Sequence, residues 1–150
     1  MSTYSFLDVV AAIAGPGGAF SIGSDAGISE EGISVEMAEE KNTMTIGASG
    51  QVMHSLHAGK SGNVTIRLLK TSPVNRQLSQ LYNLQTSSSA LHGQNQLTIR
   101  DRSRGDVVSC KQVAFAKNPA ITFAKDGGMN EWTFQAGEIS YLLGSGAPAL

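Results

Sequence analysis

Charge is scarce in this sequence, and neither sign dominates. Charged residues make up 15% of the 150 residues, and the formal net charge is −1. A protein that grips nucleic acid through phosphate contacts needs an excess of lysine and arginine, so that class is disfavoured. The low charge, together with a hydrophobic fraction of 41%, indicates a folded chain with a substantial core rather than one kept disordered by self-repulsion.

Cysteine and long apolar runs are also lacking. Cys110 is the single cysteine, which excludes an internal disulfide and a zinc site built on several thiolates. No run approaches the ~18 apolar residues of a membrane-spanning helix. The apolar stretch from Val9 to Gly18 lacks the positively charged flank of a secretory signal. We therefore expect a protein that is soluble and intracellular when it is made.

Strand periodicity dominates what is present. Apolar and polar residues alternate, as in strands with one buried face, in segments 33–38, 43–46, 63–68, 96–100, 132–136 and 139–143. Turn-forming residues separate the segments, at 41–42, 48–50, 59–62, 104–106 and 125–128. The stretch from Tyr4 to Ala14 predicts a further buried strand that ends at a glycine-rich turn. Short strands joined in this way predict a mainly β fold, an antiparallel sandwich or barrel forming a single domain over residues 1–150.

One helix is predicted, over about residues 73–86. Ser72 is a good N-cap, and Pro73 suits the first helical position. The side chains that follow at helical spacing are Val74, Leu78, Leu81, Tyr82 and Gln85. All but the last are apolar, so one stripe of the helix can dock on a sheet.

Motifs for phosphate or metal binding fail on spacing. Gly59-Lys60-Ser61 matches the end of a phosphate-binding loop, but His54 occupies the position of the required earlier glycine. A strand, rather than a helix, also follows, so a hairpin turn is the better interpretation. His54 and His57 lie three apart on a strand and point to opposite faces, which does not suit a shared metal.

The remaining reactive groups have no partners that would make a site. Cys110 has no neighbouring histidine, so we expect a buried, inert thiol. The basic cluster Arg100–Arg104 contains an acid and no aromatic residue. It is interpreted as a hairpin tip, with phosphate binding as the weaker alternative. No catalytic, cofactor-binding or metal-binding residue is predicted, and an enzyme is disfavoured.

Charges are unevenly distributed along the chain. Residues 1–50 hold seven acidic residues and one basic residue, a net charge of −6, and residues 51–150 hold a net charge of +5. One interpretation is an ordinary solvated surface. The other is a surface with opposite poles, which favours head-to-tail contacts between copies and therefore rings or filaments.

Several segments, in order over nearly the whole chain, carry a resemblance to a known family. They are Glu30–Met37, Lys41–Ala48, Val52–Gly62, Leu68–Asn75, Lys125–Trp132 and the terminal strand. These segments resemble structural proteins of contractile-tailed phages and prophages, which we identify as tail tube proteins. They are related to the haemolysin-coregulated tube protein of type VI secretion.

The resemblance implies a fold and an assembly. The fold would be a small β-sandwich or barrel with one flanking helix. Six copies would form a ring, and rings would stack into a hollow tube through which DNA passes into the host. The partners would be tail sheath and baseplate proteins. The protein would lie in the virion tail after synthesis in the host cytoplasm, without a membrane anchor. The family brings no catalytic, cofactor or metal residues.

A channel for DNA should hold few free basic groups, because these would bind phosphates and slow passage. We therefore predict that the polar faces of strands 32–38, 42–47 and 62–68 line the channel. The inward residues would be Ser34, Glu36, Thr43, Thr45 and Thr65. Arg67 shares this face and departs from the pattern, unless it pairs with Glu36 across strands.

Several loops are expected to take part in the assembly of rings into a tube. We expect the turns at 39–41 and 48–62 to make the stacking contact between rings. The glycine-rich segments 15–18, 23–27 and 48–62 and the tail 144–150 are expected to be loose in the monomer.

Four other functions stay open on the sequence alone. The chain could be the tube subunit of a type VI system or a phage-derived bacteriocin, which use the same kind of ring. It could be another virion part, such as a baseplate, connector or head-decoration protein. A monomeric ligand-binding sandwich would need an apolar pocket with convergent polar groups. An enzyme using His54, His57 or Cys110 would need a partner base that the sequence does not offer.

Overall fold

The fold is mainly β with one α-helix, as predicted. The structure is a computed structural model that describes residues 3–23 and 28–145, with the backbone alone at 23 and 28–31. After a short 3-10 turn (Phe6–Asp8), the elements are β1 (Val9–Gly15), β2 (Gly18–Gly23), β3 (Ile28–Met37), β4 (Asn42–Ile46), β5 (Val52–Leu56), β6 (Gly62–Leu69), α1 (Val74–Gln85), β7 (Asn95–Asp101), β8 (Asp106–Lys117) and β9 (Met129–Leu142). No helix among the described residues is long and apolar enough to cross a membrane.

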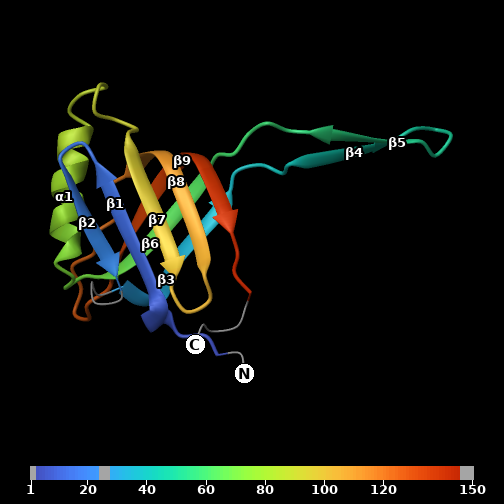
Figure 1. The fold of residues 1–150 in the computed structure, drawn as a ribbon. Helices are drawn as coiled ribbons and strands as arrows, with labels where there is room; N and C mark the ends of the chain where they lie inside the picture. The colour runs from blue at the N-terminus through green and yellow to red at the C-terminus, as the bar shows by residue number, and fades with distance from the viewer. Residues whose placement is uncertain (1–2, 24–27, 146–150) are drawn as a thin grey trace.

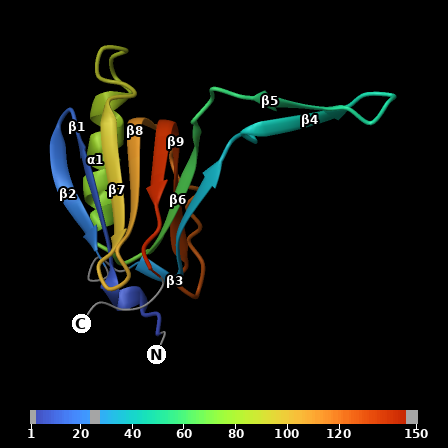
Figure 2. The same cartoon turned by 45° about the vertical axis from the view of Figure 1, so that its right-hand side comes forward.

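Seven of the strands form one antiparallel sheet in the order β2-β1-β7-β8-β9-β6-β3 (Figures 1 and 2). The outer strands β2 and β3 do not pair with each other, so the sheet is sandwich-like rather than a closed barrel. The remaining pair, β4 and β5, forms a separate two-stranded ribbon that projects away from the sheet. We call residues 39–59, which include this ribbon, the arm.

The long strands β8 and β9 fold the sheet over. Cys110 and Val113 on β8 are both buried although they lie three residues apart, and the same is true of Ala136 and Ile139 on β9. Because these residues pair across the two strands, the set of side chains that faces the core shifts by one residue at the same place in both. Gln112 has a φ of 54° there. A Cβ atom on the facing Gly137 would lie 2.7 Å from the Gln112 Oε1 atom. Glycine therefore lets the two strands bend together, and the apolar faces of β1, β7, β6 and β9 close on one core.

The helix packs as its sequence predicts and is held at both ends by polar contacts. Val74, Leu78, Leu81 and Gln85 are buried, and Tyr82 packs edge-on against Phe115 with ring centroids 5.5 Å apart. At the start, the Val74 N–H donates to the Ser72 hydroxyl over 3.3 Å. At the end, the amides of Gln85 and Asn95 exchange two hydrogen bonds of 2.7 and 2.6 Å, and Gln85 also donates to the Pro16 carbonyl. Reciprocal bonding satisfies a polar pair that would otherwise be costly to bury.

Two predicted turns are wrong, and both lie at the root of the arm. The turns at 15–18, 48–50 and 104–106 do join paired strands. Residues 41–42 and 59–62, in contrast, do not reverse the chain. They belong to the two legs that carry the arm away from the sheet. The Ala38 N–H donates to the Ser61 carbonyl and the Ile139 N–H to the Lys60 carbonyl, over 2.9 and 2.8 Å.

The ends of the predicted strands also differ. The first strand begins at Val9 rather than Tyr4, because the Ser5 hydroxyl caps the 3-10 turn by accepting from the Leu7 N–H. Segments 132–136 and 139–143 form one bent strand, which ends at Leu142. Segment 23–27 lies mostly outside the described residues, as does the tail beyond Ser145.

Candidate assembly surfaces

The polar face of β3 and β6 lies on the side of the sheet away from the core. Ser34 stands directly opposite Thr65, and Glu36 stands opposite Asn63. These side chains face outward because their neighbours on β6, Val64 and Ile66, are fully buried. The structure therefore brings Ser34, Glu36 and Thr65 onto one surface, as the alternation predicts.

Arg67 on that surface pairs with a partner other than the expected one. The register places Glu36 opposite Asn63, not opposite Arg67. The Arg67 guanidinium lies 3.3 Å from Glu131 on β9 and donates to the Ser34 hydroxyl, also over 3.3 Å. Glu131 is the cross-strand neighbour of Arg67, so an acid on β9 offsets this positive charge.

Thr43 and Thr45 lie on the arm, apart from the other three predicted channel residues. The register pairs Thr43 with Ser55 and Thr45 with Met53, which puts these side chains on one face of the ribbon. The sheet that carries Ser34 and Thr65 is not hydrogen-bonded to this ribbon. The structure thus divides the predicted set between two surfaces.

The other face of the arm is apolar and uncovered. Opposite pairs place Met44 beside His54 and Ile46 beside Val52 on this face, with Leu56 nearer the root. Met44, Ile46, Val52 and Leu56 are 54%, 61%, 53% and 86% exposed. The alternation of Met44 and Ile46 predicts burial against a core, and that prediction is wrong because no described segment of the chain covers this face of the ribbon. Residues 42–59 also contain no aspartate, glutamate, lysine or arginine.

Side-chain contacts hold the two legs of the arm together at its root. The Lys41 ammonium donates to the carbonyls of His57 and Gly59, over 3.1 and 2.8 Å. The Thr43 hydroxyl and a ring nitrogen of His57 are 2.7 Å apart, and the Asn42 amide contacts a ring nitrogen of His54. The two histidines thus have separate partners rather than converging on one point.

Reactive groups do not gather into a site. Cys110 is fully buried, and desolvation raises the pKa of its thiol to about 11, which is the inert state that the sequence indicates. Within residues 3–23 and 28–145, no three His, Cys, Asp or Glu side chains are placed to hold a metal ion.

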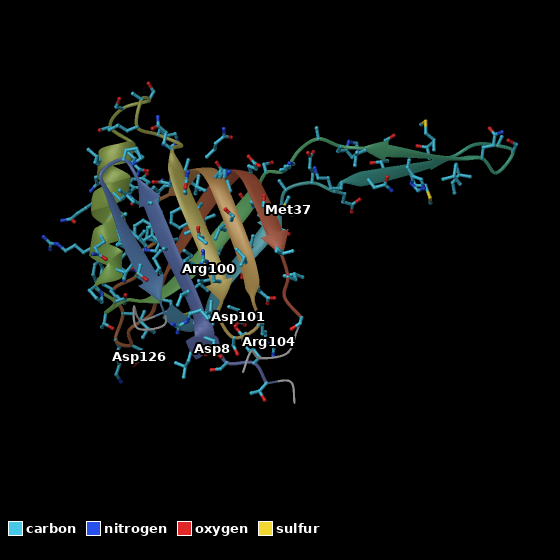
Figure 3. The ribbon with its side chains drawn as sticks, in the orientation of Figure 1. Asp8, Met37, Arg100, Asp101, Arg104 and Asp126 are labelled. Atoms are coloured by element: carbon cyan, nitrogen blue, oxygen red, sulfur yellow. The ribbon has the colours of Figure 1, made fainter. Side chains whose placement is uncertain are left out.

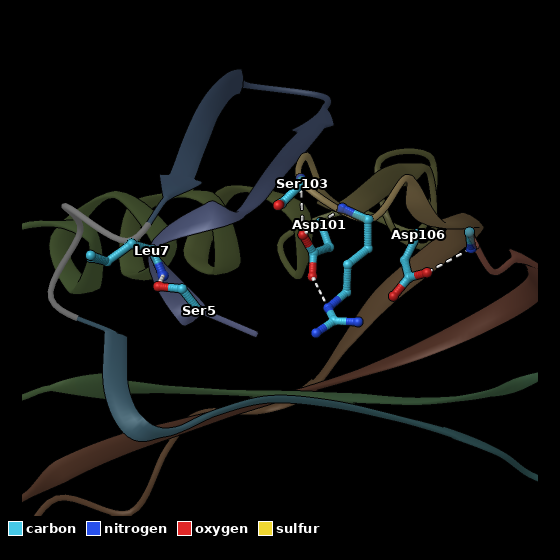
Figure 4. A network of polar contacts seen from close by, with 7 residues as sticks. Ser5, Leu7, Asp101, Ser103 and Asp106 are labelled. Carbon is cyan, nitrogen blue, oxygen red and sulfur yellow. Dashed lines mark hydrogen bonds and ion pairs between the residues drawn. The ribbon is translucent and has the colours of Figure 1, made fainter. Parts of the chain in front are cut away.

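The basic segment Arg100–Arg104 covers the end of β7 and most of the β7–β8 turn, and it contains its own acid. The buried Asp101 carboxylate accepts from the backbone N–H groups of Ser103 and Arg104, over 3.1 and 3.2 Å, and lies 3.7 Å from the Arg104 guanidinium (Figure 4). Asp106 accepts from the Gly144 N–H over 2.7 Å. This turn is therefore held by local acids, as expected of a hairpin tip, and Figure 3 shows it at the end of the sheet away from Met37 and the arm.

The sheet also has two open edges, one on β2 and one on β3. Edge strands present unpaired N–H and C=O groups, which natural proteins protect or use for pairing. An edge on each side of one subunit suits continuation of the sheet into further copies.

A comparison with protein families matches residues 1–144 to the tail tube protein of bacteriophage PhiTE. The chain belongs to this tail tube family. Its members are structural proteins, so the chain is a structural component of a phage tail rather than an enzyme.

Solved structures support the same fold. The chain is similar to a protein in the sheath–tube complex of an extracellular contractile injection system (PVC) in its extended state, with 11% identity, 94% of this chain and 92% of that chain covered, and a TM-score of 0.57. It is also similar to a protein of the tube-terminating cap of the anti-feeding prophage, with 6% identity, 95% and 93% covered, and a TM-score of 0.57. A protein of the six-fold symmetrised baseplate of that prophage gives 13% identity, 95% and 97% covered, and a TM-score of 0.52. No curated protein sequence matches the chain.

Proposed function

We propose that six copies of this tail tube subunit form a ring and that rings stack into a hollow tube through which DNA passes into the host cell. The observation that carries the proposal is the arm, which exposes five large apolar side chains, four of them on one face, and holds no formal charge from 42 to 59. A lone two-stranded ribbon is marginally stable in water. Such a surface suits burial against other copies of the chain.

Ring closure uses the sheet edges. Pairing of β2 of one copy with β3 of the next would remove both open edges, so no strand edge would remain in a closed ring. A six-fold assembly is supported by the fold likeness to the baseplate protein, whose structure was six-fold symmetrised. If four strands of each copy face the channel, 24 strands at ~4.8 Å spacing and ~40° tilt give a backbone circle of roughly 45–50 Å. A DNA duplex fits within it.

The channel wall would be the face that carries Ser34, Glu36 and Thr65. Hydroxyl groups and a carboxylate bind phosphates poorly, and Arg67 is held by Glu131 at 3.3 Å. A wall of this kind lets a polyanion pass without strong retention. Thr43 and Thr45, on the polar face of the arm, would continue the wall between rings. Sheath and baseplate proteins would then contact the opposite side of the subunit and the tube end.

Electron microscopy of the purified protein over a concentration series tests the proposal. We expect hollow rings and stacked tubes with a central channel, and class averages with six-fold symmetry. A protein that stays monomeric at every concentration, including after seeding with purified baseplates, would contradict it. Rings of another symmetry would overturn only the number of copies.

A further inference from the structure

A polar pocket lies between α1 and the connection from β8 to β9, which covers residues 118–128. Its volume is about 480 Å³, and the start of β9 forms its third wall. Trp132 on β9 lines the pocket, whereas the next residue, Thr133, stands opposite Thr65 on β6. Because side chains alternate along a strand, the pocket lies on the side of the sheet away from the proposed channel wall.

The walls of the pocket are held in place by contacts within the chain. On the helix, the Asn75 side-chain oxygen accepts from the Trp132 indole N–H over 3.0 Å. Just after β6, the Lys70 ammonium donates to the Thr122 carbonyl over 2.7 Å and lies 4.1 Å from the centroid of the Phe123 ring. The connection is therefore fixed beside the helix, and the positive charge of Lys70 is already engaged. A ligand would meet a site formed in advance.

Polar side chains converge on the pocket without partners of their own. Within residues 3–23 and 28–145, these side chains make no hydrogen bond or ion pair with the rest of the chain, and they are Arg76, Ser79, Asn83, Asn118 and Asn130. Arg76, Ser79 and Asn83 share one face of α1, and at 1.5 Å per residue they extend over about 10 Å. A pocket with convergent, unused polar groups is typical of a binding site.

The chemistry of these groups defines the class of ligand. Asparagine amides donate and accept hydrogen bonds at once, which matches peptide groups. A single guanidinium suits one carboxylate, whereas a nucleic acid backbone would need several cations. Of the described residues that line the pocket, none is aspartate, glutamate, histidine or cysteine, so a metal ion does not fit. Trp132 is 2% exposed, so its ring face is not open for stacking on a sugar.

We propose that this pocket binds a short extended peptide segment of a partner protein, with a carboxylate on Arg76 and peptide groups on the asparagines. A length of about 10 Å corresponds to roughly three residues of extended chain. Ile121, at the pocket and 57% exposed, would cover an apolar side chain next to the acid. The site itself does not depend on a tube. Its place on the outer surface of a tube rests on the proposed function, which puts the opposite face of the sheet in the channel.

Two blocked pentapeptides that differ only in charge test the site. The probe is Val-Asp-Val-Glu-Val, and its uncharged counterpart is Val-Asn-Val-Gln-Val. In titration calorimetry we expect the acidic peptide to bind tighter by about tenfold or more, because hydrogen bonds to charged groups are the stronger ones. Trp132 is the single tryptophan of the chain and lines the pocket, so its emission should change with the same midpoint.

Substitutions separate the site from general attraction between charges. We expect Arg76→Gln to abolish the preference for the acidic peptide. Arg102→Gln is the matched control, since Arg102 is an exposed arginine on the distant β7–β8 turn, and it should keep the preference. Asn83→Ala should weaken binding of both peptides by a similar factor, because it removes a contact to the peptide groups that they share.

The outcomes distinguish this proposal from the proposed function. Subunits that do not bind the acidic peptide up to about 10 mM, or that keep the preference in Arg76→Gln, would overturn the site whether or not tubes form. Binding by free subunits but not by assembled tubes would overturn its outer placement and leave the tube in place. Protein that binds the peptide but forms neither rings nor tubes would overturn the proposed function and support the site.

Discussion

Gly15 sits where the β1–β2 turn, the end of α1 and the start of β7 meet. A Cβ atom there would collide with the Asn95 side-chain oxygen, which is the acceptor of the Gln85 amide. We expect Gly15→Ala to lower the free energy of unfolding by about 2–3 kcal/mol, because it breaks a buried reciprocal amide pair. Urea unfolding measures this. Gly18→Ala is the control, since a Cβ there meets no atom within 4 Å, and an equal loss in both variants would contradict the explanation.

The buried Cys110 thiol makes stability depend on alkaline pH. Burial raises its pKa from 9.0 to about 11, so the folded state holds the proton more tightly than the unfolded state. This contribution is complete below about pH 9 and is lost as pH rises through about 11. We expect the wild type to lose stability relative to Cys110→Ala over that range, as measured by urea unfolding at several pH values. A difference that stays constant with pH would contradict it.

The helix is the element whose contribution is easiest to isolate. Leu81 is buried in the core, whereas Leu84 one turn away on α1 is 43% exposed. We expect Leu81→Ala to cost about 2–4 kcal/mol of unfolding free energy by leaving a cavity, and Leu84→Ala less than about 1 kcal/mol. Thermal or urea unfolding distinguishes them. Similar losses would indicate that α1 does not seal the core.

The arm is expected to serve assembly and not folding. Ile46→Lys puts a charge on its apolar face, so we expect rings to form while stacked tubes are lost. Thr45→Lys adds the same charge to the polar face and should leave stacking largely intact. Melting temperatures of both variants should match the wild type, because the ribbon makes no strand pairs with the sheet. Tubes of normal length from Ile46→Lys, viewed by electron microscopy, would contradict the role of this face.

Element by element, the sequence predicts which residues share a face but not what covers that face. Met44 and Ile46 alternate in the same way as Val64 and Ile66, yet the first pair is exposed and the second is fully buried. The two pairs differ only in how their strands are connected to the rest of the chain. Residues 41–42 and 59–62 extend the chain instead of turning it, so the strand of Met44 and Ile46 lies outside the sheet. The partner of Arg67 depends on the register between strands, which the alternation of apolar and polar residues does not specify. The β3–β6 register also shifts between Ile28 and Ile33, and a two-residue alternation does not predict such a shift. The helix was predictable because a 3.6-residue apolar stripe is a local signal, although it begins at Val74, with Pro73 rather than Ser72 as its N-cap.

At the scale of the whole assembly, we expect the charge of the proposed channel wall to govern the passage of DNA. We expect Ser34→Lys to leave tubes intact but to slow DNA ejection, and to make its rate rise with added salt, because new ammonium groups bind phosphates. Ser89→Lys, in the exposed segment after α1, is the control. Ejection kinetics from assembled particles measure both. An unchanged rate in Ser34→Lys would place this face outside the channel.

The arm leaves the subunit at one end only, and this has a consequence for growth. Rings joined through it would form a filament with two unlike tips, because free ribbons would project from only one of them. Addition at the two tips would then proceed at different rates, as in any directional polymer. A tail could therefore begin at a defined base and be stopped by a single factor that covers the growing tip, without any measuring device inside the subunit.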